Sequence, residues 1–437
     1  MLVSLLVALA GVFLASLFAF LPALHIYNAA GLILALSAAA GRFVPPEHLA
    51  MLFLGMITGY AMLNTIPSVF LAAPDDSTIF IVLPAQKYLR ANRGYEAAVL
   101  TGIGGLTGIA FLALLTPVAP SLLPAVHGVL RPHFHWILWA IIAYVLLSEW
   151  PKGTYRAPAG WRRWWEAWRN LVAGLLTFLL SGILGLILLY RSPIPAGVAY
   201  HNLLPAFVGL FAMPWILHNL ISCADLPEQH IAATVDASPG LILQAMLSGA
   251  LGGLFAAFFP VVTGGVGALL AGQATARRDD RLFILSQGAS KVVYYVGAFL
   301  LFFVPRLHLT RGGMAWMLTG LWRAREPGTY YTAVAAVVLS GVVSFFLLLV
   351  LARLAARLVG KVHYRWISLG TLVLLVVFVV ALTGWPGLLV CLVATGIGLI
   401  PGLWGSRRMN VMGILLLPIA LNMSGLGDLV ARWLALL

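Results

Sequence analysis

The sequence predicts an all-α, polytopic integral membrane protein, and three observations support that fold class. Hydrophobic residues make up 62% of the 437 residues and charged residues only 9%, whereas soluble domains contain roughly 45–50% and 25%. Apolar runs recur along the chain, and a helical run of roughly 20 residues spans the hydrocarbon layer. The basic residues behind the net charge of +13 are dispersed in short loops between these runs. We expect roughly 11 to 14 membrane elements, including some that do not cross fully.

The short basic loops are typical of the cytoplasmic side of a membrane protein. A nucleic-acid-binding protein would instead gather its basic residues on one folded surface. We therefore expect a multi-pass protein of the cell (cytoplasmic) membrane, with the lipid bilayer and not nucleic acid as its partner. The expected cytoplasmic loops carry Lys87, Arg90 and Arg93, then Lys152, Arg156, Arg162, Arg163 and Arg169, and, more weakly, Arg407 and Arg408.

The first apolar run, residues 2–21, has no basic region before it and no secretory domain after it. It is therefore predicted to be a retained first helix and not a signal peptide. Cys223 and Cys391 are far apart in sequence, which predicts neither a disulfide framework nor a metal site.

We predict a single membrane domain over residues 1–437 with two related halves. The first half is residues 1–150 and the second is residues 171–437. Between them, residues 151–170 interleave arginines with Trp161, Trp164, Trp165 and Trp168. That pattern favours an amphipathic segment at the membrane interface over a partner-binding helix.

A sequence pattern that occurs twice predicts the two halves. In residues 14–36 and 251–272, an apolar helix with small residues runs into a proline, a short polar stretch with glycine and a second apolar run. A further apolar helix follows each copy, at 48–70 and at 281–302. Matched interruptions favour broken helices that line a transport site, because non-helical backbone at membrane depth is tolerated only at a cavity. The alternative is a simple kink at each proline.

Polar residues follow each interrupting proline. A half-helix that begins near each proline would direct backbone N–H groups and its positive dipole end inward, which favours an anion. The candidate substrate-binding residues in these stretches are Pro22, His25, Asn28, Pro260, Thr263, Gly264 and Gly265. Alternatively, the histidine packs against a neighbouring carbonyl and the threonine bonds its own backbone.

A second polar group is the candidate site for a coupling ion. Asn64 and Thr65 lie late in an apolar run, and Asp75, Asp76 and Ser77 follow a proline. Carboxylate and hydroxyl oxygens suit hard cations, so these residues are candidates for a cation or proton site. Helix packing and a strong N-cap are the respective alternatives.

Lys291 lies near the centre of an apolar run, beside Ser290 and close to a glutamine and two tyrosines. An ionisable group at that depth is expensive and is by default functional. We therefore add Lys291 and Ser290 to the candidate substrate-binding residues. A buried structural ion pair is the alternative.

No nucleotide-binding loop, zinc-binding His-Glu pair or nucleophile elbow occurs in the sequence. We therefore expect no catalytic residues, no metal site, no enzyme activity and no ATP-driven transport. We expect no cofactor either, with Na⁺ considered only as a coupling ion.

Several segments together resemble the large permease subunit of tripartite tricarboxylate transporters, the TctA family, and especially its stand-alone archaeal-type branch. The most specific blocks are IPSVFLAAPDDSTIFIVLPAQKYLRANRGYEA at 66–97 and GLIPGLWGSRRMNVMGILLLPIAL at 398–421. Further matching segments lie at 22–31, 181–194, 203–217 and 252–270.

The resemblance implies a secondary transporter with duplicated Pro-Gly signatures along the substrate path, driven by an ion gradient. It places the signatures at Pro22 to Asn28 and at Pro260 to Gly265. The glycine that follows each proline in the family is Ala23 and Val261 here. A side chain there hinders close backbone approach to a carboxylate, so citrate itself is not predicted. A small membrane subunit and a solute-binding protein accompany the bacterial systems, and the resemblance leaves open whether a stand-alone member needs either of them.

The leading hypothesis is a proton- or sodium-coupled permease for an organic anion, with a carboxylate as the small anionic substrate. A second hypothesis is a translocase for a lipid phosphate of the polyprenyl phosphate kind. A third is a membrane-embedded enzyme that uses His25 or His218 with Asp75. The sequence is also compatible with a homo-oligomer.

Overall fold

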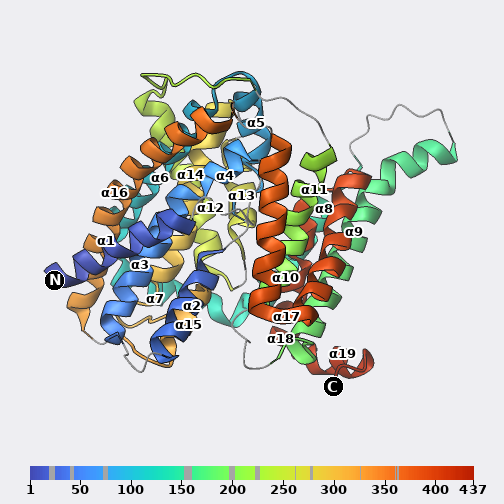
Figure 1. The fold of residues 1–437 in the computed structure, drawn as a ribbon. Coiled ribbons are helices and arrows are strands. Elements are labelled where there is room, and N and C mark those ends of the chain that lie inside the picture. Colours follow the sequence, from blue (N-terminus) through green and yellow to red (C-terminus); the bar gives the residue numbers. More distant parts are fainter. Residues whose placement is uncertain are drawn as a thin grey trace. The chain divides into compact units, whose positions relative to one another are not determined.

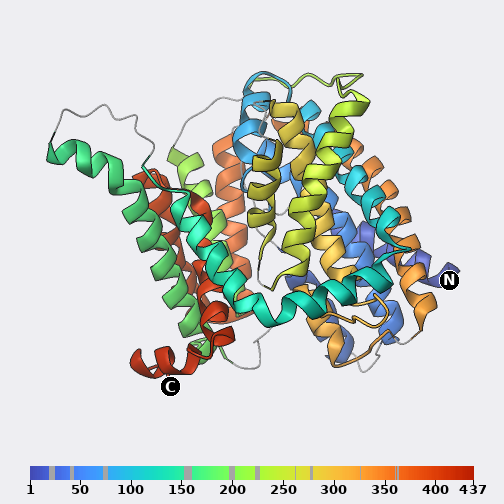
Figure 2. The same cartoon turned by 180° about the vertical axis from the view of Figure 1, so that it is seen from behind.

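The computed structural model describes residues 1–18, 25–39, 44–71, 77–151, 160–195, 202–221, 227–260, 262–275, 279–324, 326–359, 361 and 364–437. Over these residues the chain forms helices and no β-strand, so the predicted all-α fold class is confirmed. Figures 1 and 2 show the helices from opposite sides.

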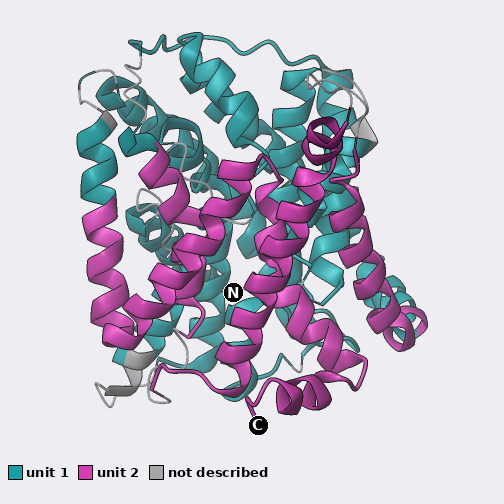
Figure 3. Cartoon of the chain, turned by 90° about the vertical axis from the view of Figure 1, so that its right-hand side faces the viewer, with its two compact units in different colours: residues 1–128, 219–371 teal, residues 129–218, 372–437 magenta. Residues whose placement is uncertain are grey.

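The chain divides into two compact units, each built from two separate segments (Figure 3). Unit 1 contains residues 1–128 and 219–371, and unit 2 contains residues 129–218 and 372–437. The duplication inferred from the sequence is a separate matter and stays a prediction.

Unit 1 contains most of the interrupted helices. Its elements are α1 (Leu2–Phe18), α2 (Ile26–Ala39), α3 (Pro46–Leu63), α4 (Thr65–Phe70), α5 (Val82–Arg90), α6 (Gly94–Leu115), α7 (Ala119–Leu130), α12 (Pro239–Phe258), α13 (Gly264–Thr275), α14 (Asp280–Leu300), α15 (Gly312–Thr319) and α16 (Pro327–Val359).

Unit 2 contains α8, α9 and the C-terminal helices. Its elements are η1 (Arg131–His133), α8 (Phe134–Leu147), α9 (Trp161–Tyr190), α10 (Leu204–Phe207), the π-helical turn η3 (Val208–Ala212), α11 (Met213–Ile221), α17 (Tyr364–Trp404), η4 (Arg408–Met412), α18 (Gly413–Met423) and α19 (Gly427–Trp433). The ends of α7, α11 and α17 cross the unit boundaries.

Among the described residues, eight helices are long and apolar enough to cross a membrane, or nine if one bent pair forms a single span. α17 has 41 residues, and a straight helix of that length extends about 60 Å, twice the hydrocarbon thickness. Gly384, with φ of 66°, interrupts it just before Pro386, so the segment holds two helices. α2 and α13, with 14 and 12 residues, are too short to cross alone.

Close packing through glycine places α14 at the centre of unit 1. A Cβ added to Gly104 of α6 would lie 2.0 Å from the Leu285 carbonyl oxygen, so only glycine fits there. The reverse contact is equally tight, because a Cβ on Gly288 would lie 2.1 Å from the Thr101 carbonyl oxygen. Such small-residue packing drives helix association in membranes. α14 also packs against α3, α12 and α13.

Candidate functional site

One face of α14 is polar in the middle of the helix. Gln287, Lys291 and Tyr294 recur at spacings of four and three residues and therefore share a face. Lys291 is only 3% exposed and Gln287 only 4%. The candidate site is built around this face, from side chains and helix ends that α3, α4, α2 and α13 bring to it.

The break between α3 and α4 provides two acceptors for Lys291. Asn64 ends α3 and precedes α4, and Pro67 follows in the first turn of α4. Because proline has no N–H to donate to the carbonyl four residues earlier, the helix is interrupted here. The Lys291 ammonium donates to Asn64 Oδ1 at 2.6 Å and to Thr65 Oγ1 at 2.5 Å.

A buried hydroxyl connects this break to the segment before α5. Ser68 Oγ lies 3.0 Å from the Asn64 carbonyl oxygen and 2.9 Å from Thr78 Oγ1. Ser68 and Thr78 are buried, and so is Ser77. The segment that follows Asp75 and Asp76 therefore lies against α4, although the two aspartates themselves fall outside the described residues.

The first Pro-centred stretch reaches α14 through His25. Its Nε2 lies 3.2 Å from the Tyr295 hydroxyl, and its ring lies 5.4 Å from that of Tyr60. His25 Nδ1 accepts from the backbone N–H of Tyr27 at 3.3 Å. In the neutral ring Nε2 then carries the proton and donates to Tyr295. Pro22 lies outside the described residues.

The second Pro-centred stretch reaches the neighbouring residue of α14. Pro260 follows the end of α12, and α13 begins at Gly264. A Cβ on Gly264 would lie 2.6 Å from Ser77 Cβ and 2.9 Å from Tyr294 Cδ1. Further along α13, the Ala268 carbonyl accepts from Gln287 Nε2 at 3.0 Å. Both stretches thus contact α14 at consecutive tyrosines.

The structure therefore brings together most of the described residues that the sequence singled out. His25, Asn64, Thr65, Ser77, Gly264 and Lys291 all lie within this cluster. Thr263, whose carbonyl accepts from the N–H groups of Val266 and Gly267, precedes the first turn of α13, and Gly265 is buried in that turn.

Two predicted residues lie at the edge of the cluster. Asn28 is partly exposed in the first turn of α2. Ser290 is buried beside Lys291, but its backbone packs against Gly249 and Gly253 of α12.

Sequence analysis did not single out Ser68 and Tyr60, which also belong to the cluster. Only the structure provides the signal, which is burial. Most of the segment Pro46–Phe70 is buried although it is apolar enough to face lipid. Polar side chains within such a wholly enclosed helix must point toward protein, so each is a site candidate.

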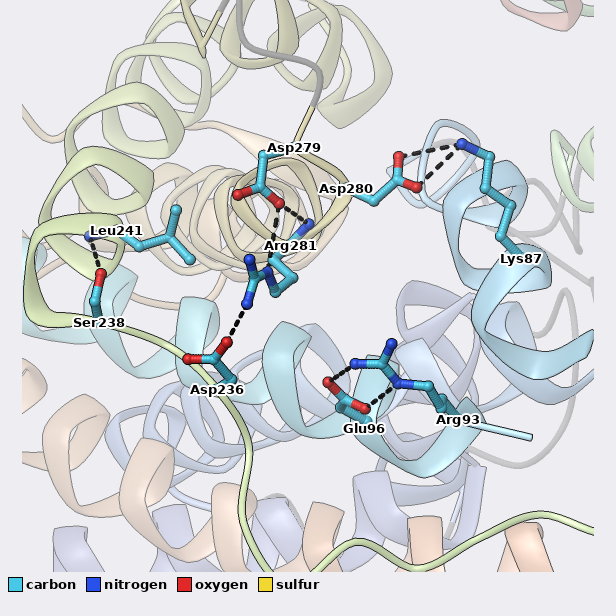
Figure 4. A network of polar contacts seen from close by, with 9 residues as sticks. All are labelled: Lys87, Arg93, Glu96, Asp236, Ser238, Leu241, Asp279, Asp280 and Arg281. Carbon is cyan, nitrogen blue, oxygen red and sulfur yellow. Dashed lines mark hydrogen bonds and ion pairs between the residues drawn. The ribbon is translucent and has the colours of Figure 1, made fainter. Parts of the chain in front are cut away.

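Charged side chains form a separate network at the end of unit 1 where α14 begins (Figure 4). Lys87 pairs with Asp280 at 3.1 Å, and Arg281 pairs with Asp236. Arg93 donates twice to Glu96, at 2.6 Å each, which raises the pKa of Arg93. Eleven residues of helix separate Asp280 from Lys291, so this network lies about 16 Å along the axis from the buried lysine.

The described residues bring groups that favour negative charge to this part of α14. A buried ammonium and the beginnings of two helices, α2 and α13, lie on one stretch of α14, and each favours negative charge. The described residues contain no group of three or more His, Cys, Asp or Glu side chains able to hold a metal ion.

Similarity to known proteins extends over most of the chain. The model of the tripartite tricarboxylate transporter TctA family matches residues 5–413. An uncharacterized protein of Methanocaldococcus jannaschii is 26% identical over 423 residues, which cover 95% of this chain and 98% of that protein. No solved structure matches.

Proposed function

This chain belongs to the tripartite tricarboxylate transporter TctA family, and from that premise we propose that it is a secondary active permease for an organic anion. Its membrane-spanning helices and family membership make it a multi-pass transporter component. The finer elements of the proposal are a carboxylate substrate, coupling to an ion gradient and a location in the cytoplasmic membrane.

The observation that carries the proposal is the buried Lys291 at the broken α3–α4 helix, on the face of α14 that both Pro-centred stretches contact. A carboxylate brought to this face gains a charge-assisted hydrogen bond and two helix N-termini. This supports a carboxylate over an uncharged or cationic substrate.

The same contacts favour a proton over Na⁺ as the coupling ion. Side-chain oxygens such as Asn64 Oδ1 and Thr65 Oγ1 suit hard cations, yet here both accept hydrogen bonds from the Lys291 ammonium. These two oxygens therefore already hold a cation of the protein itself. In the proposed cycle, Lys291 is protonated from one side, binds the anion, and releases anion and proton to the other side.

Uptake into proteoliposomes that contain the purified chain tests this function. We expect an inward proton gradient, without Na⁺, to drive accumulation of at least one labelled di- or tricarboxylate. Strict dependence on Na⁺ would exclude the coupling proposal. Uptake only after a small membrane subunit and a solute-binding protein are added would show that the chain needs the partners of the bacterial systems.

A further inference from the structure

Unit 2 contains a second polar cluster, which is partly buried and which the transport proposal does not use. It lies at the end of α8, along the first third of α9 and at the turn between α17 and α18. We call it the Arg407–Arg408 cluster, and it comprises Tyr144, Glu149, Asn170, Ser406, Arg407, Arg408 and Asn410.

Six side-chain atoms of the Arg407–Arg408 cluster are buried and make no hydrogen bond within the described part of the chain. They are Tyr144 Oη, Asn170 Oδ1, Ser406 Oγ, Arg407 Nη1, Arg408 Nη1 and Asn410 Oδ1. Most buried polar atoms in native proteins have partners, so six in one place need an explanation. The sequence predicted a solvated cytoplasmic loop at the two arginines, and the burial of their Nη1 atoms differs from that expectation.

The charges of the cluster do not balance. Glu149 is 7% exposed, and its Oε1 accepts from the Arg407 backbone N–H at 2.6 Å and from Asn410 Nδ2 at 3.0 Å. Both donors bond the same carboxylate oxygen, and neither of them is a guanidinium group. One carboxylate and two guanidinium groups leave a net positive charge, and a buried charge requires a counter-charge.

Arg408 is held in place by a stacking contact. Its guanidinium lies over the indole ring of Trp215, 3.4 Å from the ring centroid. Stacking of this kind fixes the guanidinium plane and leaves its N–H edges to donate in a fork. A phosphate has several acceptor oxygens that match such a fork.

Tryptophans surround the cluster and indicate its depth in the membrane. Trp150 follows Glu149 directly and packs on Trp168 at 5.2 Å between ring centroids, while Trp165 packs on Trp404 at 6.1 Å. Trp150, Trp165 and Trp404 are each 39% exposed or more. Exposed tryptophans at the ends of membrane helices lie at the level of the lipid headgroups.

We propose that the Arg407–Arg408 cluster binds the phosphate of an anionic phospholipid headgroup. The guanidinium Nη1 atoms and the hydroxyls of Tyr144 and Ser406 donate to the phosphate oxygens. Asn170 Oδ1 and Asn410 Oδ1 accept from the hydroxyls of a glycerol-type headgroup. Basic pockets between membrane helices bind such headgroups in the same way.

Thermal unfolding of the purified full chain in a neutral detergent tests the proposal with four probes. They are phosphatidylglycerol, phosphatidylcholine, inorganic phosphate and glycerol 3-phosphate. We expect phosphatidylglycerol to raise the midpoint temperature by several degrees and the other three to leave it unchanged, because a ligand that binds only the folded state stabilises it. Equal stabilisation by phosphatidylcholine, or by either soluble phosphate, would overturn the lipid assignment.

Substitutions test whether phosphatidylglycerol binds at the Arg407–Arg408 cluster. Arg408→Gln should weaken phosphatidylglycerol binding about tenfold or more, because it removes a charge-assisted hydrogen bond. The matched control Arg432→Gln alters an exposed arginine of α19 in the same unit and should leave binding unchanged. If Arg408→Gln does not fold, Arg407→Lys and Arg408→Lys keep the charge but lose the fork, and they should bind more weakly. Folded lysine variants with unchanged affinity would overturn the proposal.

Discussion

Both units enclose cationic groups, but different groups surround them in the two units. In unit 1, Lys291 donates to two neutral oxygens at the broken helix between α3 and α4. In unit 2, Arg407 and Arg408 keep buried N–H groups without hydrogen-bond partners in the described chain. A lysine can lose its proton when buried, whereas an arginine stays charged. The comparison indicates that the lysine cluster suits a charge that turns over during transport and the arginine cluster suits a permanently bound anion.

The largest expected effect is at Lys291. Lys291→Met should reduce proton-driven uptake to the level of empty liposomes and leave the protein folded, because methionine removes both the charge and its desolvation cost. Lys87→Met is the matched control, since Lys87 is an exposed lysine of the same unit with a side chain 68% exposed. Uptake assays and thermal unfolding of both variants provide the measurement. An unfolded Met variant would indicate a structural lysine, and unchanged uptake would remove it from the substrate path.

Glu149 tests the role of charge in the Arg407–Arg408 cluster of unit 2. Glu149→Gln should destabilise the protein without lipid by about 2 kcal/mol, because Gln accepts more weakly from the Arg407 N–H and leaves the two guanidinium charges without their nearby carboxylate. The same change makes the cluster more positive, so phosphatidylglycerol should bind more tightly than in the wild type. Thermal unfolding with and without lipid measures both effects. A variant that loses stability and lipid binding together would mean that Glu149 organises the pocket and that its charge is secondary.

Asn64 tests whether Lys291 must exchange partners during transport. Asn64→Asp places a carboxylate where Oδ1 now lies 2.6 Å from the ammonium, and the resulting ion pair should hold the lysine. We expect uptake to fall about tenfold, equivalent to about 1.4 kcal/mol, without loss of stability. Asn64→Ala is the control, because it removes the hydrogen bond without adding charge. Equal uptake by the two variants would show that charge at this position does not matter.

The sequence predicted which residues belong to the site better than it predicted which of them contact one another. The interruptions, Lys291 and the polar residues at 64 and 65 follow from periodicity and from the cost of polar groups in an apolar run. The hydrogen bond between Asn64 and Lys291 joins positions 227 residues apart, and no local pattern encodes such a contact. For Arg407 and Arg408, the charge was evident from the sequence but the surroundings were not. Their charge predicted a loop, but Arg408 stacks on Trp215, which lies far away in the sequence.

The smallest expected effect concerns the exposed ion pair between Lys87 of α5 and Asp280 of α14. Their side chains are 68% and 43% exposed, and solvent and salt screen such pairs, so Lys87→Gln should change the free energy of unfolding by less than about 0.5 kcal/mol.

Arg93 and Glu96 provide the matched comparison, because Arg93 binds Glu96 through two nitrogens and the Glu96 side chain is only 8% exposed. Glu96→Gln should therefore cost about 1.5 kcal/mol, since it weakens charge-assisted hydrogen bonds to a buried group. Thermal unfolding of both variants at low and high salt measures the difference. If Lys87→Gln proved the more damaging change, the pair between α5 and α14 would be holding one conformation of unit 1 closed, and burial alone would no longer explain which charges matter.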